Sequence, residues 1–373
     1  MAFLDYDGLR RLVAIMDERY TRNRTKDSWL TVQKNVRLGR GETLYPVGSQ
    51  LTLKHSVYGD IVMDVVSHDT VKKYGDESAH TMTLMAHNCL AKFQYDAPEA
   101  MYYAAAELGA GIYNFTVGAA YTKWAAGTYQ FTLTQAVPVG GQLCISGNAN
   151  TALTSLKVQS FASASSTNVI ESAAITSGSE GAALGTLGTE LNHPQRMSYG
   201  SNNYKESAIR QLLNSEAAAG SLWTPQTYFD RPPAWAEGTA GFLNGCSEDF
   251  LNAIATAVVK CSANNTYECP ASMGGSVTKN TAYELTDKIF LASAAEVGLN
   301  GGDVADDSTL YEFFEGASNT DRIKYLNDSA QYWWTRTPVT WGADGVRRVN
   351  ISGSLNYNSA YGVCGLVPAC IIA

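Results

Sequence analysis

The first hydrophobic pattern in the chain has the period of a helix. Over residues 5–20, apolar side chains recur at the i, i+3, i+4, i+7 spacing of an amphipathic helix, at Leu9, Leu12, Val13, Met16 and Tyr20. A polar, basic stretch follows, so residues 1–42 are predicted to be an N-terminal helix and a linker. A lone helix of this length is marginal in water. Its apolar stripe therefore indicates self-association, docking onto a larger assembly, or packing against its own domain.

Alternation with a period of two marks strands further along the chain. Strands are expected over residues 47–53 and 60–66, and a short helix over residues 99–108. Residues 111–117 and 127–134 then alternate clearly between apolar and polar side chains, and Gly140-Gly141 is a turn signal. Ser/Thr/Ala-rich runs continue to Ser177. We therefore predict a small antiparallel β-sandwich over residues 111–178, inserted into a domain that begins with residues 43–110.

The main domain resumes in residues 179–373. Helices are expected over residues 203–219 and from Ser247 onward, where the apolar stripe would be Phe250, Leu251, Ile254 and Val258. Residues 288–291 have the pattern of a buried strand. Helices and strands that alternate irregularly in this way indicate an α+β fold.

The segment 329–373 has two apolar ends and a polar centre. Its ends, residues 331–338 and 366–373, are typical of core strands, whereas residues 339–365 are rich in Asn, Ser and Tyr. Adjacent residues of a strand face opposite sides, so either Trp333 or Trp334 is expected in the core. Trp334 would then support the exposed side, together with Tyr332 and Arg336. A scaffold that fixes both ends of a polar segment displays it as a binding face.

Composition and charge narrow the classes of function. The net charge of −8 and the pI near 5.2 argue against nucleic-acid binding. The 21 Tyr and 33 Gly, with Ser/Thr/Asn tracts, are typical of paratopes and equally of secreted or virion β proteins. No apolar run approaches the roughly 20 residues of a membrane span, so no membrane insertion is expected. The N-terminus lacks the basic and apolar regions of a signal peptide.

The seven cysteines are scattered and form no CxxC pair, so no zinc site is expected. Mostly free, buried thiols are the preferred interpretation. Pairing of Cys261 with Cys269, or of Cys364 with Cys370, stays open at this point.

Short blocks in the main domain follow one another in a recognisable order. They are Gly241-Phe242-Leu243, Ser247-Glu248-Asp249-Phe250-Leu251, Asp287-Lys288-Ile289-Phe290-Leu291, Glu296-Val297-Gly298, Arg322-Ile323-Lys324-Tyr325, Tyr332-Trp333-Trp334-Thr335-Arg336-Thr337-Pro338 and Gly365-Leu366-Val367-Pro368-Ala369. Together they resemble the C-type-lectin-fold domain of bacteriophage tail proteins, including the variable proteins of diversity-generating retroelements. Residues 3–9 and 93–105 also resemble phage tail proteins. Val367 departs from the family, where Arg is common, which changes a buried ion contact but not the expected fold.

The resemblance implies a C-type-lectin-type α+β domain that ends in a variable region at about residues 332–364. It implies a phage tail adhesin without enzymatic activity, made in the bacterial cytoplasm and carried on the virion, that binds a host cell-surface protein or glycan. The N-terminal helix would bind other tail proteins or form a homotrimer. No cofactor is expected. The variable face would comprise Tyr332, Trp334, Arg336, Val339, Trp341, Asp344, Arg348, Asn350, Ser352, Ser354, Asn356, Tyr357, Ser359 and Tyr361.

Residue usage in this region agrees with mutation at adenines. The Asn codon favoured by such systems can change to many residues but never to Lys, Glu, Gln, Met or Trp. Residues 337–373 contain no Lys, Glu, Gln or Met, and Trp341 is the single Trp. A small-residue β region would avoid the same types, so residue usage is compatible with both origins.

Other kinds of chemistry have weaker support. The five His residues all precede the C-terminal segment, and no Ser/His/Asp spacing or carboxylate pair indicates catalysis. Formylglycine-generating oxidases share the lectin fold and use a Cys pair with copper, which Cys364 and Cys370 could mimic, although Cys370 has the pattern of a core thiol. A loop at residues 301–308 could bind calcium through Asp303, Asp306 and Asp307 without an EF-hand pattern. A structural virion protein that binds no host molecule is the competing non-enzymatic function.

Overall fold

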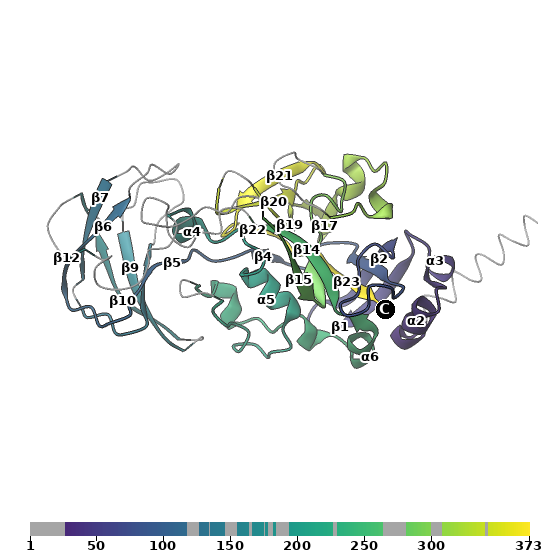
Figure 1. Ribbon diagram of the computed structural model, residues 1–373, viewed down its shortest axis with the longest axis horizontal. Coiled ribbons are helices and arrows are strands. Elements are labelled where there is room, and N and C mark those ends of the chain that lie inside the picture. Colours follow the sequence, from purple (N-terminus) through teal and green to yellow (C-terminus); the bar gives the residue numbers. More distant parts are fainter. Residues whose placement is uncertain are drawn as a thin grey trace, which may run out of the picture.

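A computed structural model describes most of the chain (Figure 1). The described residues are 27–117, 127–133, 135–145, 155–163, 166–174, 176–177, 182–183, 194–226, 230–263, 281–299, 308–339 and 342–373. The helix predicted over residues 5–20 lies outside them, as do Cys269, Asp303, Asp306, Asp307 and Trp341. Within the described part, no helix has the length and apolar character to cross a membrane.

The central sheet of the main domain combines strands from the early and late parts of the sequence. Its order is β1 (Gln50–His55), β2 (Gly59–His68), β3 (Met82–Ala86), β23 (Pro368–Ile372) and β13 (Ile254–Ala255), and β16 (Ile289–Leu291) also pairs with β23. All these pairings are antiparallel. Every residue of β23 is buried. A strand with neighbours on both edges and cover on both faces needs this apolar sequence.

A second sheet carries the candidate site. Its order is β21 (Leu355–Ser359), β20 (Gly345–Val349), β19 (Trp333–Pro338), β22 (Val363–Gly365) and β4 (Lys92–Gln94). The pairing of β19 with β22 is parallel, and the others are antiparallel. Two hairpins complete the strands of the main domain: β14 (Ala257–Ala263) with β15 (Thr281–Asp287), and β17 (Lys324–Leu326) with β18 (Ser329–Gln331). The fold class is α+β, as predicted.

The expected linker contains a helix that is part of the core. Helix α2 (Trp29–Arg37), followed by the short α3 (Gly41–Leu44), buries Trp29, Val32 and Val36. The Trp29 ring packs edge-on against Phe250 of α6 (Glu248–Ala253) at a centroid distance of 4.9 Å. Gln33 Nε2 donates to two carbonyl oxygens at the end of α6. The linker prediction was wrong here because polar residues, among them Thr31, Gln33 and Lys34, lie between these few apolar positions.

The other helices are shorter than predicted. The helix expected over residues 203–219 is α5 (Ala208–Asn214), because the Ser207 side chain accepts from Arg210 N and begins the helix there, while Ser215 is extended. Helix α6 begins after Ser247 as expected. It ends at Ala253, since Ile254 leaves the helix to pair with Ile372 in the central sheet. Single turns of 3-10 helix lie in the connections between these helices and the strands. They are η2 (Ala234–Glu237), η3 (Leu243–Gly245), η5 (Glu312–Phe314) and η6 (Asn319–Arg322).

Two four-stranded sheets are inserted between β4 and α4 (Pro194–Tyr199), at the left end of the molecule in Figure 1. One contains β5 (Ala100–Tyr103), β8 (Gly141–Ile145), β9 (Ser155–Ser163) and β10 (Ser166–Ala174). The other contains β6 (Gly111–Val117), β7 (Gly127–Leu133), β11 (Thr176–Ser177) and β12 (Ala182–Ala183), and only the β12–β6 pairing is parallel. The strands predicted over residues 111–117 and 127–134 are β6 and β7.

The helix predicted over residues 99–108 was wrong. Ala100, Tyr102 and Ala104 are buried, which is the period of a strand, and residues 100–103 form β5. The buried side chains of the insertion, among them Phe131, Leu133 and Leu143, do not belong to the main hydrophobic cluster, in which no residue falls between Tyr95 and Tyr204. The insertion therefore has a core of its own.

Buried charges join the insertion to the main domain. Arg196 of α4 donates from Nη2 to Glu99 at 2.9 Å and to Glu206 at 2.5 Å, and the backbone N–H of Glu99 donates to the Arg196 carbonyl. Asp96 accepts from Ser201 N at 3.0 Å. Burial, followed by the charge of Glu99, raises the pKa of Asp96 well above its ordinary value and that of nearby Asp230 to about 8. The chain thus enters and leaves the insertion through one carboxylate-rich cluster around Arg196.

Candidate ligand-binding face

Several side chains predicted for the binding face lie in the core instead. The buried ones are Trp334, Arg336, Val339 and Asp344. Val339 is enclosed because its side chain packs on Gly345, where an added Cβ would lie 2.6 Å from Val339 Cγ2. Asp344 lies against Tyr199 and, after burial, helps to raise the pKa of that phenol to about 12. The prediction that these four side chains are displayed to a ligand was therefore wrong, because they are buried in the supporting core.

Both tryptophans of β19 are structural. Trp334 Nε1 donates to Phe93 O at 2.9 Å, and its ring packs edge-on against Tyr95 at 5.5 Å. Trp333, on the opposite side of the strand, donates to Arg322 O at 3.0 Å. The expectation that one of the two rings would form part of the exposed face was wrong, because both are buried and the sheet is covered on both sides at β19.

Arg336 is a fully used ion-pair partner and not a ligand contact. It pairs with Glu296 through two bonds of 2.6 Å, and its remaining donors bond to Leu291 O, Lys260 O and Ser308 Oγ. All five guanidinium N–H groups thus have acceptors, which is the condition under which a buried charge is tolerated.

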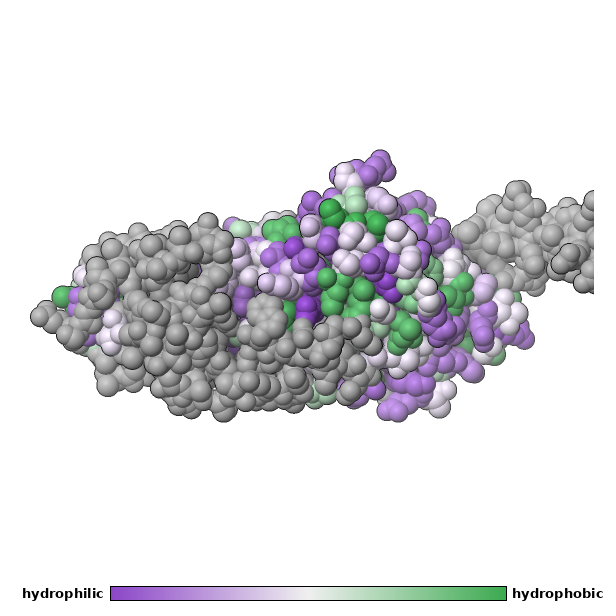
Figure 2. All heavy atoms as spheres, turned by 90° about the horizontal axis from the view of Figure 1, so that it is seen from above, coloured by the Kyte–Doolittle hydropathy of each residue, from purple (hydrophilic) through white to green (hydrophobic). Residues whose placement is uncertain are grey.

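The remaining predicted residues reach solvent. Ser352 and Tyr357 are exposed, and the half-buried ones are Tyr332, Arg348, Asn350, Ser354, Asn356, Ser359 and Tyr361. They lie on and beside β20 and β21, at the top of the main domain in Figure 1. Seen from above in Figure 2, the described surface mixes small groups of hydrophobic residues with hydrophilic ones. Such a mixed surface suits specific contacts more than bulk apolar association.

Strand register divides these residues between two sides of the sheet. Arg348 pairs with Asn356 on β21 and with Trp334 on β19, so these residues share one side. Tyr357 pairs with Arg347, which places both on the opposite side. The single face predicted from the sequence is therefore two surfaces that meet at the β21 edge.

One surface centres on Arg348, and we define the Arg348 cluster as Tyr332, Arg348, Asn356, Asn358 and Cys364. The guanidinium carbon lies 4.0 Å from the Tyr332 ring centroid. Nη1 lies 3.4 Å from Cys364 Sγ, and Nη2 lies 3.5 Å from Asn356 Oδ1. Arg348 Nε is buried and has no partner. Asn358 and Cys364 were absent from the predicted face, although the period of two from Asn356 would have indicated Asn358.

The turn before β21 holds itself in place. Asn350 N donates to Ser354 O and Gly353 N to Asn350 O, both at 2.8 Å. Ser352 N donates to Asn350 Oδ1 at 3.3 Å. Gly353 has φ +79°, and an added Cβ would meet the backbone of Asn319, so only glycine fits there. Asn350 therefore shapes the turn, while Ser352 at its tip is exposed.

Tyr361 connects the face to α4. Its backbone N–H donates to Tyr199 O at 2.8 Å, and the two rings lie 5.8 Å apart. Gln94 Nε2 donates to Tyr361 O at 2.9 Å. Tyr361 is thus fixed beside the insertion rather than free at a loop tip.

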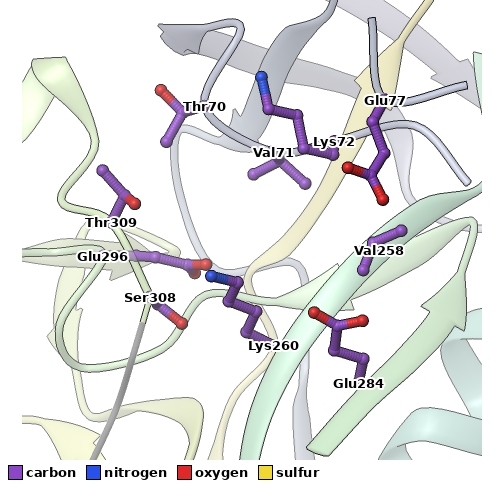
Figure 3. A pocket seen from close by; sticks show the side chains of 10 residues that line it. All are labelled: Thr70, Val71, Lys72, Glu77, Val258, Lys260, Glu284, Glu296, Ser308 and Thr309. Carbon is purple, nitrogen blue, oxygen red and sulfur yellow. The ribbon is translucent and has the colours of Figure 1, made fainter.

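A separate cavity of about 320 Å³ opens beside β14 and β15 (Figure 3). It is lined by Thr70, Val71, Lys72, Glu77, Val258, Lys260, Glu284, Glu296, Ser308 and Thr309. Figure 3 shows the Lys260 amino group directed toward Glu296, and Glu77 and Glu284 at the same opening. The charges of the two lysines balance Glu77 and Glu284, and Arg336 neutralises Glu296. Because these charges cancel, the lining of the cavity does not indicate a particular class of ligand.

The thiol and carboxylate side chains that the structure describes do not form a metal site. Among the described residues, no three His, Cys, Asp or Glu side chains come together to hold an ion. Cys364 and Cys370 are both free and buried, in β22 and β23 respectively. Burial raises the pKa of both thiols. Their pairing, left open by the sequence, is not formed.

Comparison with known proteins identifies a family but no characterised relative. The profile of the domain of unknown function DUF6273 matches residues 168–373, which is more than half of the chain and includes all of β19–β23. No curated protein matches. No solved structure matches either. The chain therefore belongs to the DUF6273 family.

Proposed function

We propose that this protein is a receptor-binding protein of a bacteriophage tail, in which a C-type-lectin-type domain presents a variable face to the host. One observation carries the proposal. The polar side chains of residues 350–363 that reach solvent lie over a buried layer, and the contacts that hold this layer together do not involve them. Trp333 and Trp334 are buried and hydrogen-bonded to backbone. The side chains of β20 and β21 that reach solvent can therefore change while the backbone stays fixed.

The arrangement of strands supports the lectin-type interpretation. Strands from the early part of the domain, β1 to β3, lie in one sheet with β23. The second sheet is formed by β19 to β22, which lie between β16 and β23 in the sequence, and by β4 from the early part. A segment bounded in this way, by β19 on one side and β23 on the other, is anchored at both ends.

The proposal extends to partners and location. The ligand is a host cell-surface protein or glycan, and the protein is carried on the virion. The N-terminal helix binds other tail proteins or brings copies together, and several weak contacts would then add up through avidity. Recognition of this kind needs no enzymatic step, no cofactor and no nucleic acid.

The gene provides the first test. We would search its flanking few kilobases for a near-copy of the sequence encoding residues 332–370 and for a reverse transcriptase. The expected copy differs only at adenines, and the differing codons encode exposed or half-buried residues such as Tyr357, Ser352 and Asn356. Differences at the codons of Trp333, Trp334 or Val349 would contradict the division into face and support, since these residues are buried.

A second test separates recognition from a purely structural role. The purified protein should bind host cells, and Tyr357→Ala combined with Ser352→Ala should reduce this binding without changing the thermal unfolding midpoint. A protein that is incorporated into virions but binds no host cell would instead be a structural virion component.

A further inference from the structure

We propose that the Arg348 cluster binds the carboxylate of an acidic saccharide. The inference rests on the proposed function and deepens it, because it names the chemical class of the ligand. Its starting point is that the Arg348 guanidinium has fewer strong hydrogen-bond acceptors than other enclosed arginines of the main domain.

Arg348 differs from those other enclosed arginines of the main domain. Arg196, Arg210 and Arg336 each donate to at least one carboxylate, and Arg322 donates to four backbone carbonyl oxygens. Arg348 donates only to a thiol sulfur at 3.4 Å and to an amide oxygen at 3.5 Å, and its Nε is buried without a partner. Sulfur is a weak acceptor, and 3.5 Å is at the limit of a hydrogen bond. Nη1 and Nη2 therefore each keep a second N–H for which no acceptor is found among the described residues, whereas the buried Nε is not available to a ligand.

The free donors are held in a fixed orientation. The Tyr332 ring lies against the guanidinium at 4.0 Å, within the range of a cation–π contact. Stacking fixes the plane of the fork and leaves its edge for hydrogen bonding, which is how arginine recognises planar oxyanions through two parallel bonds. Because Arg348 is half-buried, a bound carboxylate would be screened less than at an open surface.

The local charge is positive although the whole chain carries −8. Arg348 lowers the pKa of the Cys364 thiol that burial raises, whereas Lys92 of β4 pairs with Gly365 and so lies on the opposite side of the sheet from Arg348. No carboxylate pairs with Arg348 in the part of the chain that the structure describes. The cluster thus presents one cation and no anion.

The neutral members of the cluster favour a sugar over an acidic peptide. The Oδ1 atoms of Asn356 and Asn358 accept from the backbone N–H groups of Tyr357 and Ser359, which fixes the two amides. The Asn356 amide nitrogen is then left as a donor that suits a neighbouring hydroxyl group. Tyr332 adds a half-buried phenol. No aliphatic side chain of the cluster is available to bury the apolar part of a peptide. A saccharide that carries a carboxylate, such as a uronic acid, matches both the arginine and the Asn356 amide.

Calorimetric titration of the full chain tests the inference. The probes are an oligomer of galacturonic acid, the same oligomer with its carboxyls reduced to alcohols, and poly-glutamate of matched charge. We expect binding of the acidic sugar only, with a dissociation constant that rises by roughly tenfold to a hundredfold in Arg348→Gln. Arg347→Gln removes the same charge one residue away, on the other side of the strand, and should bind as the wild type does. Thermal unfolding shows that each variant is folded.

The other outcomes overturn the inference in separate ways. Equal binding of the reduced oligomer would show that the carboxylate is not recognised. Equal binding of poly-glutamate would show that the cluster binds any anion. An equal loss of affinity in Arg347→Gln would show that binding depends on net charge and not on Arg348. If no probe binds while the protein still binds host cells, the carboxylate assignment fails and the proposed function stands.

Discussion

At the scale of single residues, the cluster around Arg196 sets one guanidinium against several carboxyl groups. One guanidinium faces Glu99 and Glu206 directly, while Asp96 and Asp230 are buried beside them. An arginine cannot give up its proton, so the excess negative charge is relieved when carboxyls take up protons. This explains why the pKa values of Asp96 and Asp230 are raised, first by burial and then by Glu99.

A pH-dependent stability follows from Asp230. Its pKa is about 8 in the folded chain, whereas an unfolded aspartate has a pKa of about 3.9. Between these values the folded state holds more protons, so the free energy of unfolding falls as pH rises from about 4 to about 8, by at most about 1.4 kcal/mol per pH unit from this group. Asp230→Asn should flatten that slope in urea unfolding followed at pH 5, 6, 7 and 8. Asp60→Asn, at an exposed position of β2, is the control and should keep the wild-type slope. Parallel slopes for wild type and Asp230→Asn would contradict this account.

At the scale of elements, the sequence predicted the position of strands, but where both faces of a strand are buried it did not predict which side chains reach solvent. Strands β6 and β7 alternate and were located to within a residue. In β19 all six residues are buried, so alternation carried no information about which side reaches solvent, and Trp334 and Arg336 were assigned to the surface. Helix α2 was missed because its three buried apolar residues are spread among polar ones. Such contacts depend on partners distant in sequence, such as α6, which periodicity cannot reveal.

The contrast between β19 and β21 can be measured directly. Trp334→Ala should lower the free energy of unfolding by about 3–5 kcal/mol, because it leaves a cavity and removes the bond to Phe93 O. Tyr357→Ala removes a ring that is 47% exposed and should change stability by no more than about 0.5 kcal/mol. Chemical denaturation followed by circular dichroism gives both values. Similar losses in the two variants would mean that β21 is part of the supporting layer.

At the scale of the whole molecule, the two cores are connected where the chain enters and leaves the insertion. Among the described residues, the main hydrophobic cluster contains none between Tyr95 and Tyr204. The chain crosses between the cores at residues 96–99 and again at α4, where the Glu99 N–H donates to Arg196 O at 3.1 Å. Since the two crossings are adjacent, the main domain does not need the insertion to bring its own strands together.

Removal of the insertion should therefore leave the main domain folded. We expect a chain in which residues 100–193 are replaced by a short Gly/Ser linker to keep a single cooperative unfolding transition and its near-UV circular dichroism. As a matched control, Arg196→Met in the same shortened chain should lower its stability, since Glu99 would lose its buried partner. Loss of the cooperative transition on excision alone would show that the two cores form one unit.

The position of β23 has a consequence for synthesis. This strand lies between β3 on one edge and β13 and β16 on the other, yet the ribosome reaches it only after translating residues 332–364. Until then β3 has an open edge, and the central sheet cannot close. A stop codon or frameshift within the proposed variable region would therefore yield a chain without β23, whose unpaired strands expose it to proteolysis. Completion of the sheet thus acts as a check on the reading frame, because only a message read through to its last strand yields a chain with a closed sheet.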